Sequence, residues 1–272
     1  MQKLVALITS AALAFSLSSV NAKAQNAAIS EVNLKDQNTM SVLWFQKAGE
    51  AKALYYQGYN IGKMRLDEIL RKKTKNNALK PAVVLDLDET VIDNSPDQAW
   101  KVINGKADPL NWNEWINRAE AKALPGALDF LKYADSKGVA IFYISNRNEE
   151  QKSVTIKNLQ SVGLPQADVD HVLLQQPGEK GKETRRQQVA KTHEIVLLFG
   201  DNLGDFSGFD HLSVSGRIHE VDRQRDNFGK KLIVFPNPMY GDWEGAIYNY
   251  DYSKSDEAKA KLRKENLQTF QP

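Results

Sequence analysis

Short apolar runs recur through the middle of the chain and are separated by longer segments of mixed polarity. A run of four to eight apolar residues is typical of a strand buried on both faces of a sheet. The strands predicted in this way are 82–85, 139–144, 171–174, 195–199 and 231–235. The helices predicted between them are 126–136, 149–161 and 182–192. This alternation predicts an α/β fold with a doubly wound parallel sheet.

The segments on either side of this region follow other patterns. Between about residues 29 and 77, apolar positions recur at spacings of three and four, which predicts a helix whose buried face carries Tyr55, Tyr59, Gly62, Leu66 and Ile69. The stretch 95–124 is too long for a simple strand-to-helix connection and is rich in tryptophan, which suggests an inserted cap. The polar stretch 253–268 predicts an exposed C-terminal helix.

The first residues have the pattern of a secretory signal peptide. A basic start at Lys3 is followed by an apolar run to about Val20 and by the small residues Ala22 and Ala24. Several serines interrupt the run, so a membrane anchor is the weaker interpretation. The predicted organisation is a signal peptide over 1–24, a helical N-terminal region over 25–80, a core over 81–250 and a C-terminal helix over 251–272.

Composition narrows the classes of function. Residues 1–24 contain two lysines and no acid, so the remaining chain has 34 basic and 34 acidic groups. This balance gives no general attraction for a nucleic acid polymer or an anionic membrane. The chain contains no cysteine, which excludes disulfides, thiolate metal sites and attachment of a lipid to an N-terminal cysteine. We therefore expect a periplasmic or secreted protein without a stable membrane anchor.

Candidate catalytic groups follow the predicted strands, whose carboxyl ends meet at one edge of a parallel sheet. Asp86 and Asp88 follow the first strand, and Asp201 and Asp205 follow the fourth. The second strand ends in Ser145, Asn146 and Arg147, and Lys182 opens a helix. Each of these groups therefore stands at the end of a predicted strand or at the start of a predicted helix.

Phosphomonoester hydrolysis requires countercharge and positioning. Mg²⁺ held by Asp86 and Asp201 would supply the countercharge, and Asp86 would be the nucleophile. Asp88 would act as general acid and base, with Thr90 bracing it. Ser145 and Lys182 would donate hydrogen bonds to the phosphoryl oxygens. Asp205 would hold a metal-bound water or orient Lys182.

Each feature also has an ordinary structural interpretation. Asp-x-Asp occurs in calcium loops and turns, although Val91 and Asp97 stand where an EF-hand loop needs Gly and Glu. Ser145-Asn146 would serve as a helix N-cap, and Lys182 as a solvated charge. All of these features occur together at predicted strand ends or helix starts, which favours a catalytic site over the separate structural interpretations.

The chain resembles the haloacid-dehalogenase-like superfamily and, within it, the class C bacterial acid phosphatases. The resemblance rests on the motifs at 86–95, 144–147 and 200–206, with further similarity at 50–59 and 236–245. It implies an Mg²⁺-dependent phosphatase in which the metal is bound by Asp86, the Asp88 carbonyl and Asp201, with Asp205 in the same network. Many relatives are lipoproteins that are anchored through an N-terminal cysteine. This chain differs from them because it contains no cysteine.

The resemblance also implies a substrate class. Members accept nucleoside monophosphates between two aromatic side chains, for which Trp112 and Tyr240 are the best matches. It makes Lys182 the family lysine in preference to Lys180, with Ser145 and Asn146 at the phosphate. Composition alone would assign either aromatic residue to the core.

Two other functions are compatible with the same residues. A phosphotransferase would use the same residues and pass the phosphoryl group to an alcohol. An exported nucleotide- or cofactor-binding protein would use the tryptophan-rich cap as a platform and the acidic cluster only as a metal site. A homodimer is also open.

Overall fold

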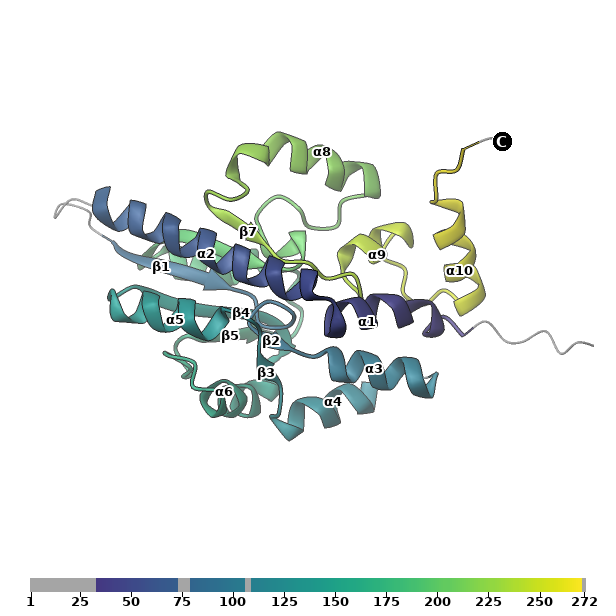
Figure 1. The fold of residues 1–272 in the computed structure, drawn as a ribbon, viewed down its shortest axis with the longest axis horizontal. Coiled ribbons are helices and arrows are strands. Elements are labelled where there is room, and N and C mark those ends of the chain that lie inside the picture. Colours follow the sequence, from purple (N-terminus) through teal and green to yellow (C-terminus); the bar gives the residue numbers. More distant parts are fainter. Residues whose placement is uncertain (1–32, 73–78, 106–108, 271–272) are drawn as a thin grey trace, which may run out of the picture. The chain divides into compact units, whose positions relative to one another are not determined.

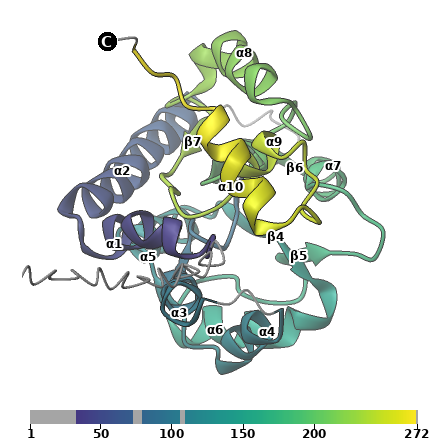
Figure 2. The same ribbon diagram turned by 90° about the vertical axis from the view of Figure 1, so that its right-hand side faces the viewer.

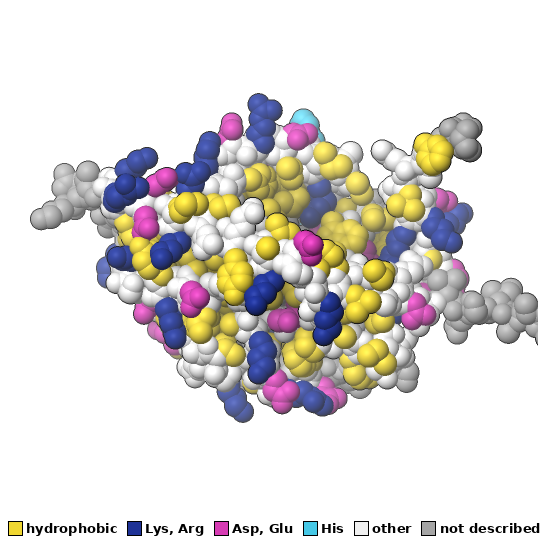
Figure 3. All heavy atoms as spheres, viewed as in Figure 1, with side chains coloured by type: hydrophobic (Ala, Val, Ile, Leu, Met, Phe, Trp, Pro, Cys, Tyr) yellow, Lys and Arg dark blue, Asp and Glu magenta, His cyan; other side chains and the backbone are white. Residues whose placement is uncertain are grey.

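The computed structural model describes residues 33–72, 79–105 and 109–270. The predicted signal peptide over 1–24 lies outside these residues. Among the described residues, no helix has the length and apolarity needed to cross a bilayer. On the face drawn in Figure 3, basic and acidic side chains are interspersed rather than gathered by sign.

The centre of the fold is a parallel sheet of five strands, in the order β5-β4-β1-β6-β7. Every neighbouring pair in this sheet is parallel, which confirms the predicted α/β class. The strands are β1 (Lys80–Leu85), β4 (Ala140–Asn148), β5 (Val172–Gln175), β6 (His193–Gly200) and β7 (Leu232–Val234). The short strands β2 (Ile92–Asp93) and β3 (Lys122–Ala123) form a separate antiparallel pair.

Helices cover both faces of the sheet because alternate strand residues point to opposite sides. In β1, Val83 and Leu85 belong to one apolar cluster with residues of α2 (Gly49–Lys72) and α5 (Ala127–Ser136). Ala82 and Val84 belong to a second cluster with residues of α7 (Glu183–Ala190) and α8 (Val214–Gln224). Figure 2 shows α2 and α7 on opposite sides of the sheet.

The helical N-terminal region contains two helices rather than one. A 3₁₀ turn (Asp36–Asn38) leads into α1 (Thr39–Lys47), and the chain becomes extended at Ala48 before α2 begins. The predicted buried face of α2 is confirmed at Tyr55, Tyr59, Gly62 and Leu66. A Cβ on Gly62 would lie 2.6 Å from the Phe199 ring, so glycine is needed for α2 to approach β6 this closely.

The interval 95–124 contains α3 (Ser95–Asn104), α4 (Pro109–Arg118) and β3. In Figure 1, α3 and α4 lie below α1 and away from the sheet. The remaining helical elements are 3₁₀ turns Glu149–Gln151, Leu203–Asp205 and Arg225–Asn227, and helices α6 (Lys152–Ser161), α9 (Asp242–Ile247) and α10 (Asp256–Glu265). The predicted C-terminal helix is thus present, although it is shorter than expected.

Strand β4 is longer than predicted. It continues through Ser145 to Asn148, and its register with β5 shifts between these two residues. Asn148, and not Ser145 or Asn146, forms the capping box of the following 3₁₀ turn. Ser145 and Asn146 are therefore free of the capping role that was their ordinary structural interpretation.

Candidate active site at the carboxyl edge of the sheet

Three neighbouring strands deliver polar groups to the carboxyl edge of the sheet. Asp86 follows β1, and its backbone N–H donates to the Phe199 carbonyl of β6 over 3.0 Å. Asp201 follows β6, and Ser145 lies near the end of β4. The sheet order places β1 between β4 and β6, which brings these groups into one crevice as expected for an open α/β sheet.

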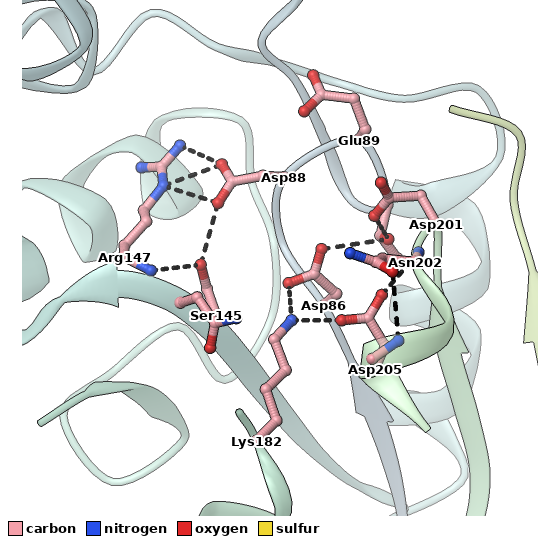
Figure 4. A network of polar contacts seen from close by, with 12 residues as sticks. Asp86, Asp88, Glu89, Ser145, Arg147, Lys182, Asp201, Asn202 and Asp205 are labelled. Carbon is pink, nitrogen blue, oxygen red and sulfur yellow. Dashed lines mark hydrogen bonds and ion pairs between the residues drawn. The ribbon is translucent and has the colours of Figure 1, made fainter. Parts of the chain in front are cut away.

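A cluster of three carboxylates occupies this crevice. Asp86, Asp201 and Asp205 each offer an oxygen, and these oxygens lie within 4.8 Å of one another. Lys182 Nζ lies between two of the carboxylates: it bonds Asp86 Oδ1 and lies 2.6 Å from Asp205 Oδ1 (Figure 4). All four side chains therefore belong to one polar network, in which Asp201 is half-buried and the other three are buried.

The cluster carries more negative charge than the lysine can neutralise. Burial, partly offset by Lys182 and reinforced by Asp205, raises the pKa of Asp86 well above its ordinary value. Burial and the neighbouring Asp205 raise the pKa of Asp201 to about 7. Burial alone would lower the pKa of Lys182, but Asp205 and Asp86 outweigh it and raise this pKa. One cation thus faces three carboxylates.

This imbalance fits a hard divalent cation. Carboxylate oxygens are the ligands that such ions prefer, and two further positive charges would offset the two carboxylates that Lys182 leaves uncompensated. Asp86 and Asp201 could serve as direct ligands. Asp205 is held by Lys182 and accepts the backbone N–H of Asn202 over 2.9 Å, so its carboxylate is fixed at the edge of the cluster.

Asp88 does not join the three carboxylates with its side chain. Its carboxylate pairs with Arg147, with Nη2 to Oδ1 at 2.7 Å, and accepts from the Ser145 hydroxyl at 3.0 Å. Burial alone would raise the pKa of Asp88, but Arg147 and Ser145 outweigh it and lower this pKa. Figure 4 shows this pair on one side of Asp86 and the cluster on the other. The cluster therefore contains three carboxylates and not that of Asp88, whose backbone carbonyl is the group that the resemblance assigns to the metal.

Thr90 also differs from its expected role. Its hydroxyl donates to Asp201 Oδ1 at 3.0 Å and lies 3.5 Å from Asp86 Oδ2, so it supports the cluster and not Asp88. The amide of Asn237 donates to the other oxygen of Asp201 at 2.8 Å. Asp201 is therefore held from two sides by residues far apart in the sequence.

The predicted phosphate-binding residues have different surroundings. Ser145 is fully buried beside Asp88, whereas Asn146 is exposed and its side-chain oxygen accepts from Arg185 at 2.8 Å. Lys182 is 5% exposed, whereas Lys180 is exposed. The geometry thus favours Lys182 over Lys180 as the lysine of the site.

A cavity of about 430 Å³ opens onto the cluster. Asp86, Asp88, Lys182 and Asp201 contribute to its wall, as do both aromatic residues singled out from the sequence, Trp112 and Tyr240. The Arg147 guanidinium carbon lies 5.6 Å from the centre of the Trp112 ring. The structure therefore brings Trp112, from α4, to the same cavity as the carboxylates.

Sequence reasoning assigned no role to three buried residues that hold this site together. Arg147 pairs with Asp88, and Asn94 donates its amide to the same carboxylate at 2.8 Å. Glu89 accepts the Asn94 backbone N–H at 2.7 Å and bonds the Tyr240 hydroxyl. All three stand inside or beside the motifs at 86–95 and 144–147, so their position next to the acidic residues was the available signal.

The parallel sheet and the carboxylate cluster at its edge define a haloacid-dehalogenase-like protein. The family model described as HAD superfamily, subfamily IIIB (Acid phosphatase), matches residues 1–243. The chain belongs to this family, which agrees with the resemblance found in its sequence.

The similar solved structures and a similar curated protein are also acid phosphatases. The class C acid phosphatase from Bacillus anthracis is 59% identical, covers 88% of this chain and 100% of its own, and superposes with a TM-score of 0.86. A second structure of that enzyme, 60% identical over the same shares with the same TM-score, has tungstate bound. Acid phosphatase 1 from Solanum lycopersicum is 26% identical over 58% of this chain. This chain spans about 57% of that plant relative's length.

Proposed function

We propose that this protein is an exported acid phosphatase that hydrolyses phosphomonoesters with the aid of Mg²⁺. The observation that carries the proposal is the cluster of Asp86, Asp201 and Asp205, two of which pair with Lys182, at the wall of a cavity. Membership of the acid phosphatase family supports the reaction class. The tungstate in the Bacillus anthracis relative also supports it, because tungstate is a tetrahedral oxyanion like phosphate.

Asp86 would be the nucleophile. Its carboxylate attacks phosphorus, the bond from phosphorus to the leaving oxygen breaks, and an aspartyl-phosphate forms on Asp86. Lys182 bonds one oxygen of Asp86, which fixes the orientation of this carboxylate in the wall of the cavity. A bound Mg²⁺ would supply positive charge to the phosphoryl oxygens, and the carboxylates of Asp86 and Asp201 would hold it.

Asp88 would be the general acid and base. In this role it donates a proton to the leaving oxygen and later accepts one from the water that attacks the aspartyl-phosphate. The contacts with Arg147 and Ser145 hold the ionised form, which suits the base step. Protonation of Asp88 for the acid step is favoured at low pH, which is consistent with an acid phosphatase.

Nucleoside 5′-monophosphates are the substrates that the cavity suits best. A volume of about 430 Å³ lies in the usual range for small-molecule sites. Trp112 and Tyr240 provide flat surfaces in its wall, on which a base can stack. We also propose that α3 and α4 form the cap that carries Trp112.

Export rests on the sequence of residues 1–24. A basic start, an apolar run and small residues before Gln25 are the pattern of a cleaved leader. Mass measurement of the N-terminus of protein recovered from cells would test export directly. An N-terminus at Met1 would count against it.

The activity is tested with a panel of phosphomonoesters assayed for released phosphate, with a chelator and after restoration of Mg²⁺. We expect the chelator to abolish turnover and Mg²⁺ to restore it, while Asp86→Asn abolishes turnover and retains the native circular dichroism spectrum. Full activity in excess chelator, or in Asp86→Asn, would overturn the proposal. Transfer of phosphate to an added alcohol in place of release would identify a phosphotransferase.

A further inference from the structure

The catalytic cavity contains a lysine that the proposed reaction does not use. Lys35 precedes the first 3₁₀ turn, is partly buried and forms part of the wall of the same cavity as Asp86 and Trp112. Among the residues that the structure describes, no side chain or carbonyl forms a hydrogen bond or ion pair with its ammonium group.

The other cations in this wall each have a carboxylate partner. Lys101, from α3, lies 2.5 Å from Asp97. Arg147 pairs with Asp88 at 2.7 Å, and Lys182 is bound by the carboxylate cluster. Within the described part of the chain, the charge of Lys35 is therefore the one in this wall that no direct contact compensates.

The surroundings of Lys35 do not favour an isolated ammonium. Burial lowers its pKa most strongly. The carboxylates of Glu244 and Asp256 act in the opposite direction, and the charge of Lys101 lowers the pKa further. Glu244 is itself paired with Arg263 at 2.5 Å. An anion bound at Lys35 would supply the negative charge that no described residue places in direct contact with its ammonium group.

The position of this charge relates to the substrate. Lys101 Nζ lies 5.7 Å from the centre of the Trp112 ring, and Lys35 lies close enough to Lys101 for their charges to interact. Lys35 and Lys101, which we call the cationic end of the cavity, therefore lie beside the surface on which we expect a base to stack. The reacting phosphate is bound by a different group of residues, around Lys182.

We propose that Lys35 binds a second anionic group on the substrate, so that the enzyme prefers phosphomonoesters that carry another phosphate or a carboxylate. This inference rests on the proposed phosphatase function and adds a substrate class to it. The second group remains attached and is not hydrolysed at Lys35. An anion held in a partly desolvated setting by one ammonium group gives a modest but measurable preference.

The test compares three nucleotides that share one reacting phosphate. AMP has no second anionic group, adenosine 3′,5′-bisphosphate adds a phosphate on the sugar, and AMP with a succinyl group on its N6 nitrogen adds carboxylates on the base. For each, kcat/KM is measured for release of the 5′-phosphate, with the wild type, Lys35→Gln and Lys35→Arg. Lys47→Gln is the matched control, because Lys47 is exposed on α1 and absent from the cavity wall.

We expect Lys35→Gln to lower kcat/KM about five- to tenfold for at least one of the two substituted nucleotides, mainly through KM, with less than a twofold change for AMP. Lys35→Arg should retain the preference, Lys47→Gln should have no effect, and added salt should weaken the preference in the wild type. The nucleotide affected tells whether the second group lies on the sugar or on the base.

Equal losses for all three nucleotides in Lys35→Gln would overturn the inference, as would unchanged kinetics with all of them. Neither result would affect the phosphatase function, since AMP would still be hydrolysed. Absence of any phosphate release by the wild type would instead overturn the proposed function itself.

Discussion

The hydroxyl of Tyr240 hydrogen-bonds the carboxyl group of Glu89, a side chain with no exposed surface that lies 151 positions earlier in the sequence. Glu89 also accepts the backbone N–H of Asn94, whose amide donates to Asp88. An aromatic wall of the cavity is thereby connected to the proposed acid and base through two buried residues. Burial raises the pKa of Glu89 well above its ordinary value, so this carboxyl group depends on its partners.

Tyr240→Phe removes the hydroxyl and keeps the ring. We expect the free energy of unfolding to fall by about 1–3 kcal/mol, because a buried carboxyl group loses a partner. Chemical denaturation measures the change. Tyr252→Phe is the control, since Tyr252 is 57% exposed and should lose almost nothing. Equal losses in the two variants would show that the Glu89 contact contributes no special stability.

Asp88→Asn should have an effect that depends on the leaving group. An alkyl alcohol needs a proton as it leaves, so we expect turnover of alkyl phosphates to fall about 10²- to 10⁴-fold. A nitrophenyl ester needs less help, and its first step should be affected less. Rapid-quench measurement of the first turnover separates formation of the aspartyl-phosphate from its hydrolysis. A uniform loss across leaving groups would argue that Asp88 positions the site and does not transfer a proton.

The two candidate lysines can be separated by substitution. Lys182→Gln removes the cation that faces Asp86 and Asp205, and we expect kcat to fall about 10²- to 10³-fold. Lys180→Gln changes an exposed side chain and should retain activity within about twofold. Steady-state measurement of kcat for both variants shows which lysine contributes to turnover. The reverse pattern would move the phosphate contact to Lys180.

Stability should depend on pH through Asp201. Its pKa in the folded protein is about 7, raised by burial and then by Asp205, against an ordinary value of 3.8. Between these values the folded protein keeps a proton that the unfolded chain has released, so without metal the free energy of unfolding should decrease as pH rises from about 4 to 7. The Asp201 contribution is on the order of 4 kcal/mol.

Thermal melts in a chelator at several pH values would measure this slope. Asp201→Asn should make the slope shallower without abolishing it, because the pKa values of Asp86 and Glu89 are raised as well. Added Mg²⁺ should stabilise the wild type more at pH 7 than at pH 5, because protons compete with the metal for the same oxygens. A slope that is identical in Asp201→Asn would assign the titration to another group.

Trp112→Ala should impair nucleotides more than small esters. Base stacking on an aromatic ring is worth roughly 1–3 kcal/mol, so we expect KM for AMP to rise by the corresponding factor while KM for glycerol phosphate changes little. Trp100→Ala is the matched control, since Trp100 lies on α3 and faces a different cavity. Equal effects of Trp112→Ala on both substrates would remove Trp112 from the base site.

Local sequence patterns were sufficient for the fold class and for most residues at the sheet edge. Apolar runs such as 82–85 and 195–199 predict buried parallel strands because only such strands are apolar on both faces. Parallel strands then end at one edge, so Asp86 and Asp201 follow without coordinates. The break at Ala48 did not follow, because the helical periodicity continues through it. The extension of β4 to Asn148 did not follow, because the apolar run stops at Ile144, and tertiary packing decides where an element ends.

The partners of each charge were decided by tertiary structure alone. Asp88 and Asp86 are two residues apart, yet one faces Arg147 and the other Lys182, and the chain bends at Leu87 between them. The place of Lys35 in the cavity wall and the contact between Glu89 and Tyr240 likewise bring together segments distant in the sequence. A sequence specifies which charges are available, whereas desolvation and distance, which set how strongly charges interact, exist only once the chain has folded.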